Sequence, residues 1–358
     1  MSRILISGYY GFHNLGDEAV LAATAAELRR RRPEAHIAAL SASPAETARI
    51  HGIDGVPRGD PREIVRSLRR CDLFLCGGGS LFQDATSWRS PWYYLSILAL
   101  ARRLARRTVV YAQGIERFHR APVRAAVAAL LDRVDLITVR DAASLSHLTD
   151  IGVRRPRVVL SADPSLLLTP DWSAAAKAEK ARWGNGAAWG LALRSWDRGD
   201  AVRAAADAAR ILTARRGMRW ILLPMHPPGD LAVAETLAER LSPAAVVVRA
   251  PLGPREMLAL IGSLDLLVGM RLHALLFAAA QGVPIVPIAY DPKVEALTRD
   301  LGEPVPVPAS AVSPHELARS MEAAVEDRQN RRARLLAAAE ALRRRAALSP
   351  QLAADLLP

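Results

Sequence analysis

Two short segments in the second half of the chain carry cationic side chains directly after apolar runs. GMRLH covers residues 269–273 and YDPK residues 290–293. Arg271 and His273 fall where a helix is expected to begin, so their donors add to the positive end of the helix dipole and form an anion site. A stray Arg and a packed His explain this pattern poorly, because an unpaired cation there is electrostatically unfavourable. Lys293 is one of three lysines among 48 basic residues, which favours a role for it.

Glycine-rich segments follow apolar runs in the first half. They are GYYGFHNLGDEA at residues 8–19 and CGGGSLFQD at residues 76–84. Glycines let a backbone approach a ligand closely, but the acids Asp17 and Glu18 at a helix start would repel a pyrophosphate. A sugar hydroxyl suits Asn14 and Asp17 better, with an ordinary acidic helix start as the alternative. Further polar segments at strand ends are YAQGI (111–115), VRD (139–141), LRSWD (193–197) and LPMH (223–226). In VRD, an arginine such as Arg140 taken alone is more often part of a surface ion pair, here with Asp141.

Alternating strand and helix patterns must position these side chains. Apolar runs of β type occur at residues 4–7, 37–40, 73–76, 108–112, 136–139 and 158–160, and again at 189–193, 220–224, 245–248, 266–269 and 285–289. Segments of helical period lie between them, which predicts two α/β halves with parallel sheets. Ligands of such sheets bind beyond the carboxyl ends of the strands, where these motifs fall. We therefore predict two Rossmann-like domains facing across a cleft.

The domain limits follow from the interruptions in this pattern. Pro170, a polar stretch and Gly184-Asn185-Gly186 place the joint near residues 169–187. The expected domains are residues 1–170 and 185–312. After the proline-spaced turn at residues 304–308, residues 314–345 predict one or two amphipathic helices. They belong to a C-terminal helical segment, residues 313–358, that we expect to pack on the domains.

The charge balance indicates anionic partners without identifying them. The chain has 48 Lys plus Arg and 36 Asp plus Glu, a net charge of +12, which suits nucleic acid, a membrane surface or phosphorylated substrates. Nucleic acid is disfavoured because the basic residues form helix-face clusters, such as Arg102-Arg103 and Arg106-Arg107, without a recognised binding motif. Such clusters favour an anionic membrane surface, at roughly 1 kcal/mol per residue. Composition bias with no partner stays an open alternative.

The remaining global features concern cysteines and targeting. Cys71 and Cys76 are too few for a disulfide framework or a zinc ligand set, so we expect core thiols. Charged or polar residues interrupt the longest apolar stretches, which argues against a transmembrane helix. The start of the chain runs into a strand-like segment without a cleavage-site pattern. We therefore expect a cytoplasmic protein, peripheral at the inner face of the plasma membrane if the basic surface binds lipid.

The ordered motifs together resemble the polysaccharide pyruvyl transferase family, in particular its CsaB-type branch, which acts in cell-wall anchoring of surface-layer proteins. The resemblance spans about residues 3–300 and is carried by GYYGFHNLGDEA, CGGGSLFQD, YAQGI, VRD, MRLHALLFAAAQGVP and YDPKV. Each motif alone is weak, whereas all of them in order are specific. The sequence departs from the family at Glu116-Arg117, where glycine and proline are common, and we assign that turn no role.

The resemblance implies an enzyme with a GT-B-like fold, its first domain on the acceptor side and its second on the donor side. The donor would be phosphoenolpyruvate, and the product a ketal-linked pyruvate on a sugar. For the CsaB-type branch the acceptor would be N-acetylmannosamine in a lipid-pyrophosphate-linked disaccharide. The residues carried over as phosphoenolpyruvate ligands are Arg140, Arg271, Leu272, His273 and Lys293.

The chemistry of this donor agrees with the cations present. Phosphoenolpyruvate carries a phosphate and a carboxylate, so it requires at least two cationic clamps. His273 is the best general acid for protonating the donor methylene carbon. The base that takes the hydroxyl proton is left open among Asp17, Asp84 and Asp197, and neither a metal nor a redox cofactor is required. We expect the acceptor sugar to contact Tyr10, Phe12, Asn14, Gln83 and Arg194.

A second hypothesis is a nucleotide-sugar glycosyltransferase of the same GT-B fold, because fold does not fix function. Such an enzyme needs an acid for the ribose of its donor, and Glu295 is the candidate in this sequence. Binding of phosphoenolpyruvate against binding of a nucleotide sugar distinguishes the two hypotheses.

Overall fold

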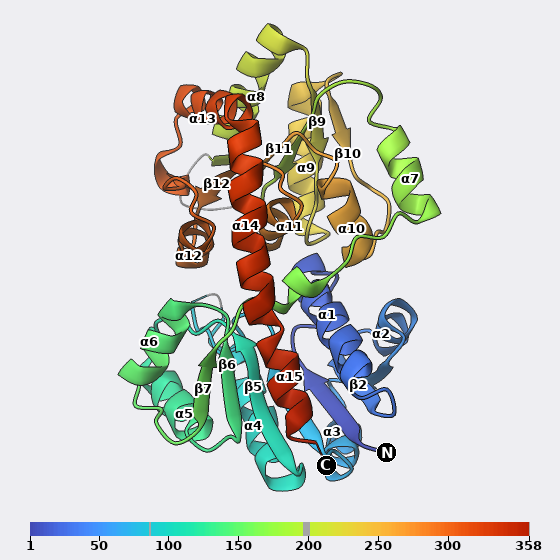
Figure 1. Cartoon of the computed structure of the whole chain (residues 1–358), viewed down its shortest axis with the longest axis vertical. Helices are drawn as coiled ribbons and strands as arrows, with labels where there is room; N and C mark the ends of the chain where they lie inside the picture. The colour runs from blue at the N-terminus through green and yellow to red at the C-terminus, as the bar shows by residue number, and fades with distance from the viewer. Residues whose placement is uncertain (86, 196–200, 358) are drawn as a thin grey trace. The chain divides into compact units, whose positions relative to one another are not determined.

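The computed structural model describes residues 1–85, 87–195 and 201–357 (Figure 1). It divides into two compact units, one of Met1–Leu168 with Leu342–Pro358 and one of Thr169–Ala341. The second boundary falls inside helix α14 (Arg328–Ala346). The helical segment predicted from residue 313 is therefore shared between the units.

The first unit is built on a parallel sheet of seven strands in the order β3-β2-β1-β4-β5-β6-β7. Its strands are β1 (Arg3–Ser7), β2 (His36–Ser41), β3 (Asp54–Pro57), β4 (Leu73–Gly77), β5 (Arg107–Gln113), β6 (Leu136–Val139) and β7 (Arg157–Leu160). Its helices are α1 (Leu15–Arg31), α2 (Pro44–His51), α3 (Pro61–Arg69), α4 (Arg89–Leu104), α5 (Ala121–Leu131), α6 (Ala142–Asp150) and α15 (Leu348–Asp355), with a 3-10 turn at Pro164–Leu167.

Helices cover both faces of this sheet, and successive strand residues supply the two cores. Leu5 of β1 packs in a cluster with side chains of α3, α4, α5 and α6. Its neighbours Ile4 and Ile6 point to the other face and pack with α1 and α15. Side chains alternate along a strand, so burial on both faces requires the continuous apolar runs on which the strands were predicted. The hydroxyl of Ser349 in α15 lies 2.9 Å from that of Thr138 in β6, which ties the end of the chain to the first sheet.

The second unit contains a parallel sheet of six strands in the order β10-β9-β8-β11-β12-β13. Its strands are β8 (Ala188–Ala192), β9 (Arg219–Leu222), β10 (Ala245–Val247), β11 (Leu266–Gly269), β12 (Ile285–Ala289) and β13 (Val307–Pro308). Its helices are α7 (Ala174–Ala181), α8 (Ala201–Arg216), α9 (Gly229–Leu241), α10 (Pro254–Ile261), α11 (Leu272–Ala280), α12 (Pro292–Asp300) and α13 (Pro314–Glu326), together with most of α14.

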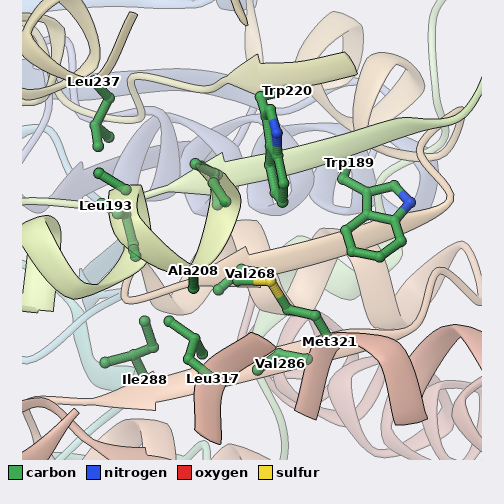
Figure 2. Packing of buried hydrophobic residues seen from close by; sticks show 14 of the residues in the cluster. Trp189, Leu193, Ala208, Trp220, Leu237, Val268, Val286, Ile288, Leu317 and Met321 are labelled. Atoms are coloured by element: carbon green, nitrogen blue, oxygen red, sulfur yellow. The ribbon is translucent and has the colours of Figure 1, made fainter. Parts of the chain in front are cut away.

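The core on one face of the second sheet is formed with α8, α9 and α13 (Figure 2). Trp189 of β8 and Trp220 of β9 are partners in the sheet register, and their rings meet edge to face with centroids 5.6 Å apart. Met321 of α13 packs in the same cluster. Each of these side chains is at most 2% exposed, so this face is fixed by large, fully buried groups.

The predicted strands are found in the structure, three of them with the same bounds: β6, β11 and β12. Two short strands were not predicted. β3 contains Asp54, Gly55 and Pro57, and β13 is a Val-Pro pair in the segment interpreted as a turn. The residues from 314 onwards form α13 and α14, as expected for one or two helices, and then α15.

The two cysteines are buried and unpaired, as expected for core thiols. Burial raises the pKa of each thiol to about 12, so neither is a thiolate near neutral pH. In the described part of the chain, no helix has both the length and the apolar character needed to cross a bilayer.

Candidate functional site

The chain leaves β1 and β4 in opposite directions across the first sheet, and ligands of such sheets bind where this happens. Gly78 and Gly79 follow β4 with φ of +78° and +77°, a region that favours glycine. A Cβ at Gly78 would lie 2.4 Å from Val20 of α1, and one at Gly79 would lie 3.1 Å from Oδ1 of Asp17. The glycine run therefore packs against the start of α1 and brings Asp17 to this edge.

Two other residues of the loop after β1 have local structural roles. Asn14 is the N-cap of α1, and its side-chain oxygen accepts a hydrogen bond from the backbone N–H of Gly16 at 3.1 Å. Glu18 is buried, accepts from the backbone N–H of Gly11 at 2.8 Å and lies 2.7 Å from Nε2 of His51. Of the two acids at this helix start, Glu18 is buried and Asp17 is half-buried.

The structure contradicts the expectation that Tyr10 contacts a sugar. Its ring is 1% exposed, and its hydroxyl donates to the backbone oxygen of Gly77 at 2.9 Å. Burial raises the pKa of Tyr10 well above its ordinary value. Gly8 gives the ring its space, because a Cβ there would lie 2.3 Å from it. Phe12 is half-buried and stacks on Tyr9 with ring centroids 4.2 Å apart.

The side chains after the glycine run divide into a buried and a half-buried group. Asp84 is 2% exposed and accepts hydrogen bonds from the backbone N–H groups of His119 (2.9 Å) and Arg120 (2.8 Å). A carboxylate that holds a loop in this way is poorly placed to take a proton from a substrate, which argues against Asp84 as the base. Gln83 is half-buried and accepts from the backbone N–H of Ala85 at 3.0 Å.

Arg140 follows β6 and is buried rather than on the surface. Its Nη2 donates to Oγ of Ser80 at 3.2 Å, and its guanidinium lies 3.6 Å from Asp163 and 3.7 Å from Asp141. Gly114 leaves room for this side chain, because a Cβ there would lie 2.7 Å from Nη2. The ends of β4, β5 and β6 thus build one polar site, in which the expected Asp141 contact is present together with a second carboxylate.

The candidate cations of the second unit follow three neighbouring strands of its sheet. Arg194 comes after β8, Arg271 and His273 after β11, and Lys293 after β12. In a parallel sheet these positions share the carboxyl edge. The strand order therefore puts Lys293 at the same edge as Arg271 and His273 and adds Arg194 to them.

Arg271 is not the unpaired cation that the sequence suggested. Its guanidinium forms two hydrogen bonds with Asp230, one of them from Nε at 2.8 Å. Asp230 is 2% exposed and also accepts from the backbone N–H groups of His226 (2.9 Å) and Met225 (3.2 Å). The pair ties the segment after β9 to the segment after β11 across β8. Two of the five guanidinium donors are used, which leaves three without a partner among the described residues.

His273 lies in the first turn of α11, next to the half-buried Leu272 that begins the helix. Its Nε2 atom is buried, and its ring lies edge-on to Phe277 one turn later, with centroids 6.5 Å apart. Packing against Phe277 restricts the imidazole at the helix N-terminus. This position suits a group that must present a proton in one direction.

Lys293 and Arg194 meet at the ring of Tyr290. The Nζ of Lys293 lies 5.8 Å from the ring centroid, and the guanidinium carbon of Arg194 lies 5.0 Å from it. Asp291 caps α12 by accepting from the backbone N–H of Lys293 at 3.0 Å, and its other oxygen lies 2.8 Å from Nζ. Arg194 therefore stands with the expected donor ligand Lys293 in the second unit. The sequence predicts Arg194 as a contact of the acceptor sugar instead.

The residues predicted as ligands of phosphoenolpyruvate belong to both units. Arg140 belongs to the first unit, whereas Arg271 and Lys293 belong to the second. Asp197 lies outside the described residues. Sequence reasoning missed Asp230, whose only signal was an acid in the first turn of a helix. It also missed Arg58, which follows the unpredicted strand β3.

Comparison with solved structures shows the same fold. The chain matches Anabaena Alr3699/HepE in complex with UDP and glucose at 15% identity, with a TM-score of 0.62 and 99% of each chain covered. It matches the UDP-GlcNAc 2-epimerase from Neisseria meningitidis bound to UDP-GlcNAc at 11% identity, with a TM-score of 0.67 and coverage of 98% and 100%. A putative UDP-N-acetylglucosamine 2-epimerase from Listeria monocytogenes gives 11% identity, a TM-score of 0.65 and coverage of 99% and 94%. The protein has a GT-B-like α/β fold with two Rossmann-like domains.

Sequence comparison identifies the family. No curated protein matches the chain significantly. The family model described as polysaccharide pyruvyl transferase matches residues 14–292, a range that contains Arg140, Arg271 and His273 and ends one residue before Lys293. The chain therefore belongs to the polysaccharide pyruvyl transferase family.

Proposed function

We propose that the protein transfers the enolpyruvyl group of phosphoenolpyruvate to a sugar as a ketal and releases phosphate. The observation that carries the proposal is the set of cationic and imidazole groups after β8, β11 and β12, in which Arg271 and Lys293 are held by Asp230 and Asp291. A donor with both a phosphate and a carboxylate requires several cations in fixed positions. Arg140 in the first unit is a further candidate ligand.

The reaction needs a proton donor for the methylene carbon and acceptors for two hydroxyl protons, one of which restores the acid while the other leaves with the phosphate. A proton added to the methylene carbon of the donor makes the adjacent carbon electrophilic, and a sugar hydroxyl attacks that carbon while losing its own proton. The carbon–oxygen bond to phosphate then breaks, and a second hydroxyl of the sugar closes the ketal and loses its proton. His273 is the proposed acid because its imidazole lies at a helix N-terminus beside the cations. Asp17 is the proposed base, with Asp197 as the other candidate.

The proposed acceptor is N-acetylmannosamine in a lipid-pyrophosphate-linked disaccharide, and the proposed pathway is cell-surface anchoring. Phe12, Asn14 and Gln83 of the first unit supply an aromatic face and amide groups, which suit a sugar. An acceptor of this kind places the enzyme at the inner face of the membrane.

Purified protein tests the proposal directly. With phosphoenolpyruvate and the disaccharide diphosphate on a short water-soluble chain, we expect one phosphate released and one pyruvate added per sugar, with or without a metal chelator. Abolition by the chelator and rescue by a divalent ion would refute the metal-free mechanism.

The same assay addresses the glycosyltransferase alternative. The likeness to structures that hold UDP-glucose or UDP-GlcNAc is at most 16% in sequence identity and concerns the fold alone. Glu295, the candidate ribose ligand, is exposed on α12. Transfer from UDP-glucose without use of phosphoenolpyruvate would establish the alternative.

A further inference from the structure

Two large aromatic side chains are exposed at the start of α4. Trp88, which directly precedes the helix, is 55% exposed, and Trp92 is 41% exposed. They are four positions apart, so they lie on the same side of the helix, one turn from each other. The tyrosine and phenylalanine rings of the first unit are all buried or half-buried. An exposed apolar pair of this kind marks a contact with a partner, whereas single exposed apolar residues are ordinary.

Arginine side chains stand beside these rings. The guanidinium carbon of Arg89 lies 5.3 Å from the ring centroid of Trp88, and Arg89 is itself exposed. The hydroxyl of Tyr93 donates to the backbone oxygen of Arg58 at 3.1 Å, so the first turns of α4 lie beside the segment that leads into α3. Arg62 lies in the first turn of α3 and is exposed. Exposed rings and exposed cations thus occur together where the two helices begin.

An open hollow of about 560 Å³ runs along α3. It is lined by Pro61, Arg62, Val65, Arg66, Arg69 and Arg70. Arg62, Arg66 and Arg69 recur every three or four positions, so they lie on one face of the helix. The opposite face carries Ile64 and Leu68, which are buried in the core against the sheet. The hollow is therefore positive and faces away from the sheet.

Acids are scarce in these two helices. Together, α3 and α4 contain six arginines and one acid, Glu63, which lies 3.5 Å from Arg66. Asp60 precedes α3 and is engaged as its N-cap, where it accepts the backbone N–H of Arg62 at 2.9 Å. By contrast, α1 on the other face of the sheet contains three acids and three arginines. A composition that favours arginine over lysine does not remove acids, so the positive charge is a property of this face.

We propose that the outer sides of α3 and α4 form a surface that docks on an anionic bilayer. In it, Trp88 and Trp92 enter the headgroup region, because the indole ring is apolar and its N–H group is polar. Arg62 and Arg89 bind lipid phosphates through their charge and their paired hydrogen-bond donors. The rings lie at the opposite end of α4 from the basic residues of its last turn. The inference goes beyond the proposed function, because none of its evidence depends on the reaction.

The charge of this surface distinguishes a bilayer from other partners. A second copy that docked through the same surface would place like charges opposite each other across a two-fold interface. An anionic bilayer is negative over its whole area, so it attracts the arginines of both helices together. The exposed rings add an apolar contact, which salt does not screen. Binding should therefore have one part that salt weakens and one part that it does not.

Vesicle sedimentation with the full chain measures both parts. The probes are vesicles of phosphatidylcholine alone and of phosphatidylcholine with phosphatidylglycerol, each at low and at moderate salt, and the wild-type chain should prefer the anionic vesicles. The double variant Trp88→Ala, Trp92→Ala should bind these vesicles about 10-fold more weakly, by the same factor at both salt concentrations. The double variant Arg62→Gln, Arg89→Gln should bind them about 10-fold more weakly at low salt, with a smaller loss at moderate salt.

A matched control and a second measurement keep the test independent of folding. Trp172→Ala removes a tryptophan of the second unit that is 40% exposed and should leave vesicle binding unchanged. The double variant Trp88→Phe, Trp92→Phe keeps an aromatic ring at both positions. In vesicles whose acyl chains carry bromine, the tryptophan fluorescence of the wild-type chain should be quenched, because bromine quenches only indoles that reach the bilayer. The Phe variant should lose this quenching while it still binds the vesicles.

Three outcomes would overturn the proposal. The first is unchanged vesicle binding and quenching in the tryptophan variants. The second is an equal loss of binding with Trp172→Ala, which would show general adsorption of apolar side chains. The third is that Trp88→Ala, Trp92→Ala loses self-association, or binding to a single-stranded oligonucleotide, while vesicle binding is unchanged. The surface would then belong to a second copy or to a nucleic acid.

Turnover on the water-soluble acceptor separates this inference from the proposed function. It should be unchanged in the tryptophan variants, because these side chains are not placed in the candidate site. If vesicle binding depends on the tryptophans but the wild-type chain transfers no pyruvate, the proposed function fails and the docking surface stands. If pyruvate is transferred but the tryptophan variants bind vesicles normally, the docking surface fails and the proposed function stands.

Discussion

The cations at the edges of the two parallel sheets are held by two different means. In the second unit, Arg271 and Lys293 each lie beside a carboxylate that also accepts backbone N–H groups. In the first unit, Arg140 likewise lies beside carboxylates, whereas Arg58 lies among aromatic rings and forms no ion pair with a carboxylate of the described residues. A carboxylate partner fixes the position of a cation but cancels part of its electrostatic field. Aromatic rings also fix the position but leave most of that field.

This difference suggests a division of labour. Phosphoenolpyruvate carries two anionic groups, so several partly neutralised cations can share it and release the phosphate afterwards. A single uncompensated cation suits one phosphate group that must only be bound. Two questions follow. One is how much the carboxylates at the edge of the second sheet contribute to stability and catalysis, and the other is whether the basic cluster on α4 of the first unit binds anions.

The largest expected effect concerns Asp230. Asp230 is 2% exposed. Replacing it by Asn leaves the guanidinium of Arg271 without its negative partner. Breaking a buried pair in this way costs about 3–5 kcal/mol of unfolding free energy. Urea unfolding monitored by tryptophan fluorescence measures this loss of unfolding free energy. The matched control is Asp291→Asn, whose half-buried pair with Lys293 should cost under about 1 kcal/mol. Equal losses in both variants would contradict the distinction.

His273 gives the next largest effect. Gln in its place keeps a hydrogen-bond donor but removes the proton that the imidazole supplies, so turnover should fall about 10²-fold or more with a modest loss of donor affinity. Phosphate release at saturating phosphoenolpyruvate is the measurement. Near-normal turnover would make His273 a ligand only, and His13 and His226 would become the candidates for the acid. Of these, His13 is exposed and lies 3.5 Å from Glu46.

These residues also show how far sequence reasoning reaches. Strands buried on both faces are continuous apolar runs, so β6 and β11 were predicted to the residue, and the positions of Arg271 and His273 followed from β11. The partner of Arg271 is 41 positions away in another helix, and no local pattern marks such a pair. Arg58 was missed for a related reason, because β3 is short and contains Gly and Pro. When a strand is not predicted, the sequence does not place the residue that follows it at the carboxyl edge of the sheet.

Burial of single side chains was the other source of error. Tyr10 lies in a loop that looks open in the sequence, yet Gly8 makes the space into which its ring folds. Asp84 resembles a ligand after a glycine run, but it accepts backbone N–H groups from residues 35 and 36 positions later. Both outcomes depend on tertiary contacts that spacing does not contain.

Replacing Lys293 should have a smaller effect than replacing His273, and the effect should be on KM rather than on kcat. Ala in its place removes a point charge and no proton transfer, so the KM for phosphoenolpyruvate should rise about 10-fold with kcat nearly unchanged. Initial rates over a range of donor concentrations separate the two constants. Lys180→Ala is the matched control, because that lysine packs on Trp183 at 4.4 Å within the same unit. A fall in kcat at unchanged KM would contradict a binding role for Lys293.

The smallest effect on turnover is expected from the basic cluster at the opposite edge of the first sheet. Arg102 and Arg103 lie in the last turn of α4, and Arg106 precedes β5. Replacing the three by Gln should weaken binding to phosphatidylglycerol vesicles at low salt and leave turnover on a water-soluble acceptor within about 2-fold. Arg107 is kept, because it pairs with Asp135 at 2.8 Å.

A control of equal charge decides whether this cluster acts as a surface. Arg3, Arg124 and Arg154 are exposed residues of the same unit that are scattered along the sequence, and their replacement by Gln removes the same total charge. If the clustered variant loses more vesicle binding than the scattered one, the three arginines form a lipid-binding surface. If both lose equally, net charge alone accounts for the attraction, since long-range fields depend on the sum of charges. If neither changes, the arginine content reflects composition bias, and the membrane-surface hypothesis for this cluster is wrong.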